Sequence, residues 1–267
     1  LLGLSGRCRK EKRVRRLLLG TLVSAALLPV GASQGAVLVH GRPVVIVTRG
    51  RGVTSSTNWS GYATYRTGTT FTDVKGTWAQ PSATCPSRKA QYSSFWVGID
   101  GYNSNSVEQT GTDADCTSKN HPSYYAWYEM YPNPPVNLSM TVSPGNTMSA
   151  EVSASGSSFT LTITNVTTGA TFTTTQSLGS AAKTSAEWVA EAPSSCRFTC
   201  TVLPLANFGT VNFSGSYTTG NGHTGSISDP AWSNDEIVMV TNGGAVKAQP
   251  SVLSQDGTSF SVTWQHN

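Results

Sequence analysis

Ser94-Phe-Trp-Val-Gly-Ile-Asp100 carries a clear β-strand pattern. Successive side chains of a β-strand point to opposite faces, so residues two apart share a face. One face of this stretch carries Phe95, Val97 and Ile99, and the other carries Trp96, Gly98 and Asp100. The stretch therefore predicts a strand with one face in a hydrophobic core and one face available for chemistry.

Three further segments show the same alternation. In Tyr125-Ala-Trp-Tyr-Glu-Met-Tyr131, one face holds Tyr125, Trp127, Glu129 and Tyr131. In Val107–Asp113, one face holds Gln109, Gly111 and Asp113. In Glu187-Trp-Val-Ala-Glu191, the two Glu share the face opposite Trp188 and Ala190. Carboxylates beside aromatic rings on a sheet surface are typical of a substrate groove. The alternative is a solvated outer face that happens to carry acids.

The rest of the chain favours an all-β protein, because no apolar run at helical spacing is long enough for a helix. Short alternating segments separated by turn residues indicate a sandwich or a barrel. Three hairpins are predicted, with turns at Asn165–Gly169, Asn242–Gly244 and Gln255–Thr258. The last would pair Val252–Ser254 with Ser259–Trp264.

The first residues indicate export. A basic start is followed by the apolar run Leu17–Val30 and by small residues, the order found in a secretory signal peptide. This run is shorter than the roughly 20 residues of a membrane-spanning helix. We therefore predict a signal peptide over residues 1–32, a short propeptide or flexible N-terminal arm over 33–53, and one β-sandwich domain over 54–267. The mature protein is expected to be secreted, extracellular and not attached to a membrane.

The charge balance argues against nucleic-acid binding. The chain has 18 Lys and Arg against 14 Asp and Glu, but seven of these bases and only one acid lie in residues 1–32. The remainder has 11 bases and 13 acids, a net charge of −2. A slightly acidic surface offers nothing to a phosphate backbone.

Four cysteines remain after the predicted signal: Cys85, Cys116, Cys196 and Cys200. An even number in an oxidising compartment favours two disulfides over free thiols. Three pairings are open, and we favour Cys85–Cys116 and Cys196–Cys200 because each closes a local loop. The four histidines, which show no metal-ligand spacing, are His40, His121, His223 and His266. We expect no metal and no cofactor.

Five ordered motifs resemble the glutamic peptidase (eqolisin) family over roughly residues 55–265. They are Asn58-Trp-Ser-Gly-Tyr62, Phe95-Trp-Val-Gly-Ile-Asp-Gly101, Gln109-Thr-Gly111, Tyr125-Ala-Trp-Tyr-Glu-Met-Tyr-Pro132 and Ala186-Glu-Trp-Val-Ala-Glu191. The resemblance implies a concanavalin/lectin-like sandwich of two antiparallel sheets. It also implies an endopeptidase that cleaves proteins or peptides in acid.

The resemblance makes Gln109 and Glu191 the catalytic pair. It places six further residues in the substrate cleft: Trp96, Asp100, Asp113, Trp127, Glu129 and Tyr131. Tyr125 stands where fungal members often have Asp, so the polar network around it is expected to differ. An ionised Glu can act as general base for water, and an amide N–H can stabilise an oxyanion. Glu187 is the alternative to Glu191.

Other mechanisms find little support in the sequence. No Asp-[Thr/Ser]-Gly is present, which excludes a pepsin-like site. Gly-x-Ser-x-Gly occurs once, at Gly31–Gly35, where the predicted signal peptide ends, and not in the predicted β-sandwich domain. The alternative function is a secreted carbohydrate-binding, lectin-like module without catalysis, since such sandwiches also present Trp and Tyr on a sheet. A catalytically inactive family member is a third possibility. A monomer is expected.

Overall fold

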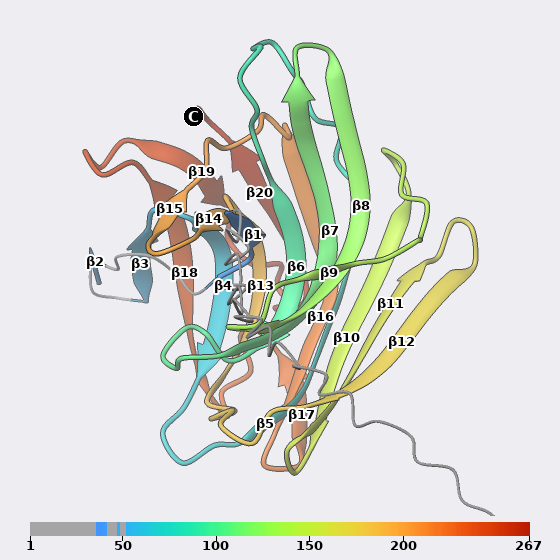
Figure 1. Cartoon of the computed structure of the whole chain (residues 1–267). Coiled ribbons are helices and arrows are strands. Elements are labelled where there is room, and N and C mark those ends of the chain that lie inside the picture. The colour runs from blue at the N-terminus through green and yellow to red at the C-terminus, as the bar shows by residue number, and fades with distance from the viewer. Residues whose placement is uncertain (1–35, 42–46, 49–51) are drawn as a thin grey trace, which may run out of the picture. The chain divides into compact units, whose positions relative to one another are not determined.

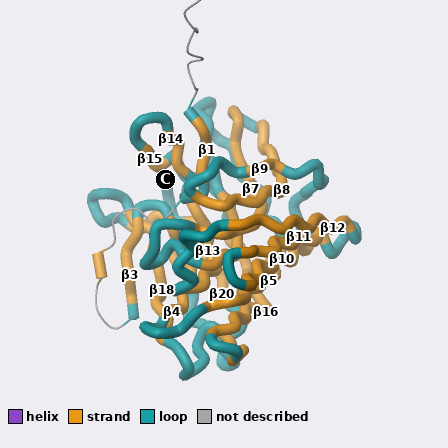
Figure 2. The backbone as a smooth tube through the Cα atoms, turned by 60° about the horizontal axis from the view of Figure 1, so that its bottom comes forward, coloured by secondary structure: helices purple, strands orange, loops and turns teal. Residues whose placement is uncertain are grey.

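The structure is a computed structural model that describes residues 36–41, 47–48 and 52–267. The signal peptide predicted over residues 1–32 lies outside these residues, as does much of the segment 33–53. Every regular element in the described part is a β-strand, and Figure 2 shows strands joined by loops. That part accordingly offers no helix long and apolar enough to cross a membrane.

The strands form two layers that are joined along one side (Figure 1). In spatial order the first sheet consists of β9 (Val136–Asn137), β8 (His121–Tyr131), β7 (Val107–Ser118), β6 (Ser94–Ile99), β13 (Ser185–Glu191), β4 (Trp59–Tyr65), β18 (Ser233–Val240), β3 (Val53–Ser56) and β2 (Val47–Thr48). The second consists of β12 (Ala170–Ser177), β11 (Ser158–Asn165), β10 (Thr147–Ser155), β5 (Phe71–Ala79), β16 (Thr210–Gly220), β20 (Phe260–Trp264) and β19 (Val246–Pro250).

Smaller pairings complete the fold. β17 (His223–Ser226) pairs with β16, and β18 pairs with β19 to join the two sheets. A separate small sheet holds β1 (Val37–Val39), β14 (Ser194–Cys196) and β15 (Cys200–Val202). Neighbouring strands are antiparallel except for β3 and β18, which are parallel. The predicted all-β sandwich of two antiparallel sheets is confirmed.

The core between the layers comes from the apolar faces predicted above. Phe95, Val97 and Ile99 of β6 belong to one large buried cluster, together with Trp188 of β13 and Trp78 of β5. Both indoles donate a hydrogen bond across the interface between the sheets. Nε1 of Trp188 donates to the carbonyl of Lys75 at 2.8 Å, and Nε1 of Trp78 donates to Thr112 Oγ1 at 3.0 Å. The two sheets are therefore locked in register by polar contacts as well as by packing.

The predicted hairpins are found with one exception. β11 and β12 flank the turn at Asn165–Gly169, and β18 and β19 flank Asn242–Gly244. The segment Val252–Ser254 was wrongly predicted as a strand. The returning chain is bonded to Ser251, just before the segment, and to Ser254 at its end, with backbone bonds from Ser251 N to Ser261 O and from Ser254 N to Ser259 O. Val252 between them is 83% exposed, so no ladder forms there.

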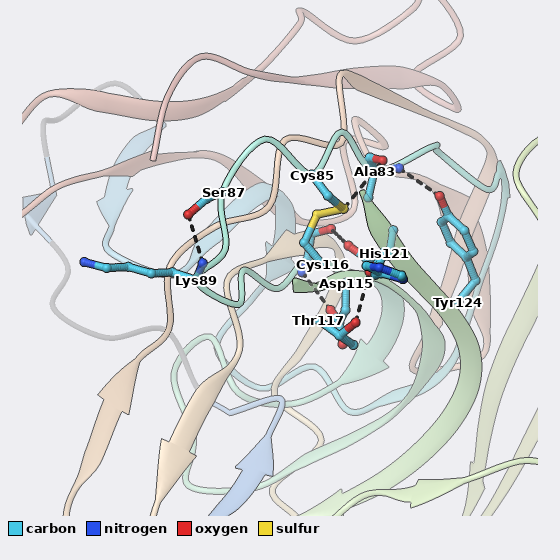
Figure 3. Close-up of a disulfide and its surroundings, with 11 residues drawn as sticks. Ala83, Cys85, Ser87, Lys89, Asp115, Cys116, Thr117, His121 and Tyr124 are labelled. Carbon is cyan, nitrogen blue, oxygen red and sulfur yellow. Dashed lines mark hydrogen bonds between the residues drawn. A yellow bond between two sulfur atoms is a disulfide. The ribbon is translucent and has the colours of Figure 1, made fainter. Parts of the chain in front are cut away.

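Two disulfides, Cys85–Cys116 and Cys196–Cys200, form the pairing favoured from the sequence. Figure 3 shows the first, which ties the loop at Cys85 to the end of β7. Near it, the Tyr124 hydroxyl accepts a hydrogen bond from Ala83 N at 3.1 Å. These links hold the β7–β8 pair, which carries many of the polar side chains described below. The second disulfide closes the hairpin between β14 and β15.

Buried carboxyl groups are unusually frequent in this fold. Burial, reinforced by the nearby Asp100 carboxylate, raises the pKa of Glu108 to about 8. Burial and contact with Glu151 raise the pKa of Asp73 to about 7. Both groups stay protonated in the folded chain at pH values where the unfolded chain has already released the proton. Because the unfolded state binds fewer protons in this window, stability falls as the pH rises from about 4 to about 8.

We therefore predict that the melting temperature is higher at about pH 4.5 than at about pH 8. Each 1 kcal/mol lost from the free energy of unfolding lowers the melting temperature by about 2–4 °C in a domain of this size. Circular dichroism across the pH series measures the effect. The control variant Glu108→Gln keeps the shape and removes the titration, so its profile should be flatter and its stability at about pH 8 higher. A melting temperature that rises with pH would contradict the prediction.

Candidate active site

The outward face of the first sheet carries three rows of side chains that the strand register aligns. One row joins Glu187, Gly98, Gln109 and Glu129. The next joins Val189, Trp96, Gly111 and Trp127. The third joins Glu191, Ser94, Asp113 and Tyr125. The alternation predicted from the sequence thus brings Gln109, Asp113, Glu129 and Glu191 to one face, with aromatic rings between them.

Two glycines lie directly against Trp96. A Cβ built on Gly111 would lie 2.5 Å from Trp96 Cβ and 2.3 Å from the carbonyl oxygen of Phe95. A Cβ on Gly98 would lie 3.1 Å from Trp96 Cζ3. A side chain at Gly111 would therefore require β6 and Trp96 to move, and a side chain at Gly98 would crowd the indole. The indole Nε1 donates to Glu191 Oε2 at 2.8 Å.

Glu191 is completely buried and accepts three hydrogen bonds. Besides Trp96, Oε1 accepts from Gly41 N at 3.1 Å and from Asn58 Nδ2 at 3.3 Å. Burial raises the pKa of Glu191 well above its usual range, and the Glu129 carboxylate adds to this. His40 and the donors Trp96 and Asn58 act in the opposite direction by stabilising the ionised form.

The side chain of His40 is buried against the row that contains Trp127. Its ring stacks on the indole with centroids 3.6 Å apart and planes 2° from parallel. Nδ1 lies 3.2 Å from Glu129 Oε2, and Nε2 lies 3.3 Å from the Asp113 carboxylate. Burial alone would lower the pKa of His40, but Asp113 and Glu129 together raise it to about 10. Both ring nitrogens therefore donate, as an imidazolium does.

The peptide unit between His40 and Gly41 lies between two polar side chains. The carbonyl of His40 accepts a hydrogen bond from Gln109 Nε2, and the N–H of Gly41 donates to Glu191. The carbonyl of Gly41 accepts from Trp59 Nε1 at 2.8 Å. Gln109 Oε1 is buried and has no hydrogen-bond partner among the described residues. An amide donor and a carboxylate thus face the two ends of one peptide bond.

Tyr125 links two carboxyl groups at the edge of this cluster. Its hydroxyl lies 2.8 Å from Asp113 Oδ2 and 2.8 Å from Asp115 Oδ2. One phenolic proton cannot serve both, so one carboxyl group must supply a proton itself. Burial, and then the Asp113 carboxylate, raises the pKa of Asp115 well above its usual range. A neutral Asp115 therefore donates to Tyr125, which donates to Asp113, and Trp127 Nε1 also donates to Asp113 at 2.6 Å.

Asp100 and Glu187 lie at the margin of the site. Asp100 accepts hydrogen bonds from the backbone of Lys183 at 2.6 Å and of Thr184 at 2.9 Å, on the side of the sheet near Glu187. Glu187 accepts from Tyr102 N at 3.3 Å, and burial raises its pKa well above the usual range. Tyr131 is near the peptide unit instead, because a Cβ built on Gly41 would lie 3.5 Å from its Cε2.

Sequence reasoning missed three members of the cluster: His40, Asp115 and the role of Tyr125. His40 was set aside for its lack of ligand spacing, and it reaches the site from 89 residues before Glu129. Asn58 could have been found from the sequence, since it begins the motif Asn58-Trp-Ser-Gly-Tyr62. Within the described residues, no group of three or more His, Cys, Asp or Glu side chains is placed to hold a metal ion.

Comparison with known proteins gives a consistent result. Residues 57–264 match the Peptidase A4 family. The chain is similar to aspergillopepsin-2 of Aspergillus niger, with 32% identity over 233 residues that cover 78% of each chain. It is also similar to scytalidopepsin B of Scytalidium lignicola, with 34% identity over 66% of this chain and 68% of the relative.

Solved structures agree with the sequence relatives. Scytalido-glutamic peptidase in complex with a transition state analog inhibitor superposes with a TM-score of 0.68 and 29% identity, over 78% of this chain and 98% of that one. Aspergilloglutamic peptidase from Aspergillus niger gives a TM-score of 0.56 and 33% identity, over 66% of this chain and 99% of that one. With the match to residues 57–264, these likenesses show that the chain belongs to the Peptidase A4 family and is a glutamic-type endopeptidase.

Proposed function

We propose that Glu191 and Gln109 are the catalytic pair of a secreted endopeptidase that works in acid. The observation that carries the proposal is the position of the peptide unit between His40 and Gly41. Gln109 donates to its carbonyl oxygen, and Glu191 contacts its nitrogen at 3.1 Å. Amide hydrolysis requires stabilisation of negative charge on the carbonyl oxygen and protonation of the leaving nitrogen.

The proposed reaction uses each of these contacts in turn. Ionised Glu191 takes a proton from water, and the hydroxide adds to the carbonyl carbon. The amide N–H of Gln109 stabilises the oxyanion, while its Oε1, which has no partner in the part of the chain that the structure describes, is available to hold the attacking water. Protonated Glu191 then donates to the leaving nitrogen, which becomes the new amine. Trp96 and Asn58 hold the Glu191 carboxylate in position throughout.

Four further residues are proposed to contact substrate. Trp127 offers an aromatic face, Glu129 and Asp113 offer carboxylates, and Tyr131 lies beside the position of Gly41. Trp96 serves by orienting Glu191. Asp100 was predicted to line the cleft, and its contacts with Lys183 and Thr184 favour a role in holding that loop.

Acid favours this site because several carboxyl groups crowd together. Glu129, Asp115 and Glu191 all have a raised pKa through burial. Ionising all of them in one water-poor cluster would be costly. In acid Glu129 and Asp115 are neutral, and the His40 cation and the donors Trp96 and Asn58 then favour the ionised form of Glu191. The signal-like residues 1–32 and the two disulfides support secretion.

A carbohydrate-binding module was the alternative. Lectin-like sandwiches present aromatic rings in the same way, but they need no carboxylate facing an amide donor across a peptide bond. The substrates of this family are proteins or peptides, and the contacts around His40 and Gly41 are of that kind. A monomeric state remains a prediction.

We predict that Glu191→Gln lowers the rate of hydrolysis of a denatured protein at about pH 3 by about 10²–10⁴, the usual contribution of a general base. Gln109→Ala should lower it by about 10²–10³, as expected for one oxyanion donor. Glu187→Gln is the matched control on the same strand and should keep its activity. The wild-type activity should resist pepstatin and EDTA. Activity that survives in Glu191→Gln but disappears in Glu187→Gln would make Glu187 the general base in place of Glu191.

We predict that Trp96→Phe moves the acidic limb of the kcat/KM profile to higher pH by about one unit. The indole hydrogen bond stabilises ionised Glu191, so its loss raises the pKa of the base. One unit corresponds to about 1.4 kcal/mol, within the range for a hydrogen bond to a charged group. Trp232→Phe is the control, since its indole donates to Ser226 instead. A limb that stays in place or moves to lower pH would argue against this role.

A further inference from the structure

We propose that the bond between His40 and Gly41 is the site at which this enzyme cleaves its own chain. The segment from Val37 to His40 occupies the substrate side of the cleft, so the full chain is a precursor that processes itself. The same contacts select substrates with histidine immediately before the cleaved bond and a small residue after it. The inference rests on the proposed catalytic pair and adds the substrate and the maturation site.

The backbone of the arm is bound as an added β-strand. Val37, Leu38 and Val39 of β1 pair antiparallel with Cys196, Ser195 and Ser194 of β14. Addition of an extended strand to a sheet edge is a common way to hold a peptide by its main chain. Since β14 begins three residues after Glu191, this pairing delivers the next residue of the arm, His40, to the carboxylate row.

The peptide unit is held at three points. Gln109 donates to the His40 carbonyl, Glu191 contacts the Gly41 nitrogen, and Trp59 donates to the Gly41 carbonyl at 2.8 Å. An arm bound only to cover the site would need no such contacts at both ends of a single peptide bond. The geometry is the one that hydrolysis requires.

The His40 side chain fills a site built for a flat cation. It is fully buried, stacks on Trp127, and places its two nitrogens against Glu129 and Asp113. Its backbone N–H also donates to Glu129 at 2.9 Å. The carboxyl groups close enough to interact electrostatically with the imidazole are Asp113 and Asp115 on β7, Glu129 on β8 and Glu191 on β13. A cation stacked on Trp and paired with carboxylates is strongly favoured once it is out of water.

The position after the bond is restricted to small residues. A Cβ on Gly41 would meet Tyr131 Cε2 at 3.5 Å, which is ordinary van der Waals contact. Alanine therefore fits at this position, whereas a longer side chain would have to displace the phenol ring. The imidazole pocket before the bond and the phenol wall after it together define the sequence preference.

The reaction balances with water as the only co-reactant. The water oxygen bonds to the carbonyl carbon of His40, and one water proton passes through Glu191 to the Gly41 nitrogen. The bond between carbon and nitrogen then breaks. The products are a carboxyl group at His40 and an amine at Gly41.

The test begins with the precursor, prepared near neutral pH. It is then acidified to about pH 3–4, where Glu191 is proposed to act as general base. Mass spectrometry of the released fragment should find His40 at its C-terminus. The rate should not depend on dilution, because arm and site belong to one chain. His40→Ala should slow this cleavage by about 10- to 100-fold, the usual contribution of charge-assisted contacts. The exposed His121 provides the control His121→Ala, which should leave the rate unchanged.

A second experiment needs no variant of the enzyme. A synthetic peptide that copies residues 36–47 is offered to the processed wild-type enzyme beside a version with Ala in place of His40. The first should be cut after His with a kcat/KM about 10- to 100-fold higher than the second.

The outcomes separate this inference from the proposed function. Hydrolysis of a denatured protein combined with release of fragments that end elsewhere would overturn self-cleavage at His40 and leave the catalytic pair standing. Equal cleavage of the two peptides would overturn the histidine preference. Failure to cleave the denatured protein, the arm or either peptide would overturn the catalytic pair and this inference together.

Discussion

The close approach of Gly98 and Gly111 to Trp96 sets the position of the Glu191 carboxylate. Trp96 can take its place on the sheet only because these two residues have no side chain. Trp96 pairs with Val189 of the neighbouring strand β13. The indole N–H reaches Glu191, which lies two residues further along that strand. A residue with a Cβ at Gly111 would displace Trp96 and disturb the shortest hydrogen bond of the Glu191 carboxylate.

The fold imposes a second constraint, since the layers must stay in register for these rows to meet. The indoles of Trp188 and Trp78 each donate across the core to the opposite sheet. Trp188 lies between Glu187 and Glu191 in sequence but points inward, so one strand contributes to both the core and the site. The packing that stabilises the sandwich therefore also sets where the two carboxylates emerge.

Much of this could be predicted from the sequence, because alternation is a local property. The apolar face of β6, the polar face of β7 and the aromatic face of β8 follow directly from spacing by two. His40 could not be found in this way. Its place depends on β1 pairing with β14, a contact across more than 150 residues that no local pattern encodes. The hydroxyl of Tyr125 between Asp113 and Asp115 was equally hidden, since only the three-dimensional arrangement shows that one phenol can join two carboxyl groups.

The edge strand β14 has a consequence for which proteins can be attacked. β15 covers one of its edges and the arm covers the other through three consecutive residues. A chain that replaces the arm must offer the same extended main chain, which residues inside a helix or a closed sheet cannot do. On the proposed mode of binding, the enzyme requires an extended backbone whatever the sequence, so folded proteins become substrates only as they lose their structure. Acid, in which the enzyme is proposed to work, also unfolds many proteins and so supplies such chains.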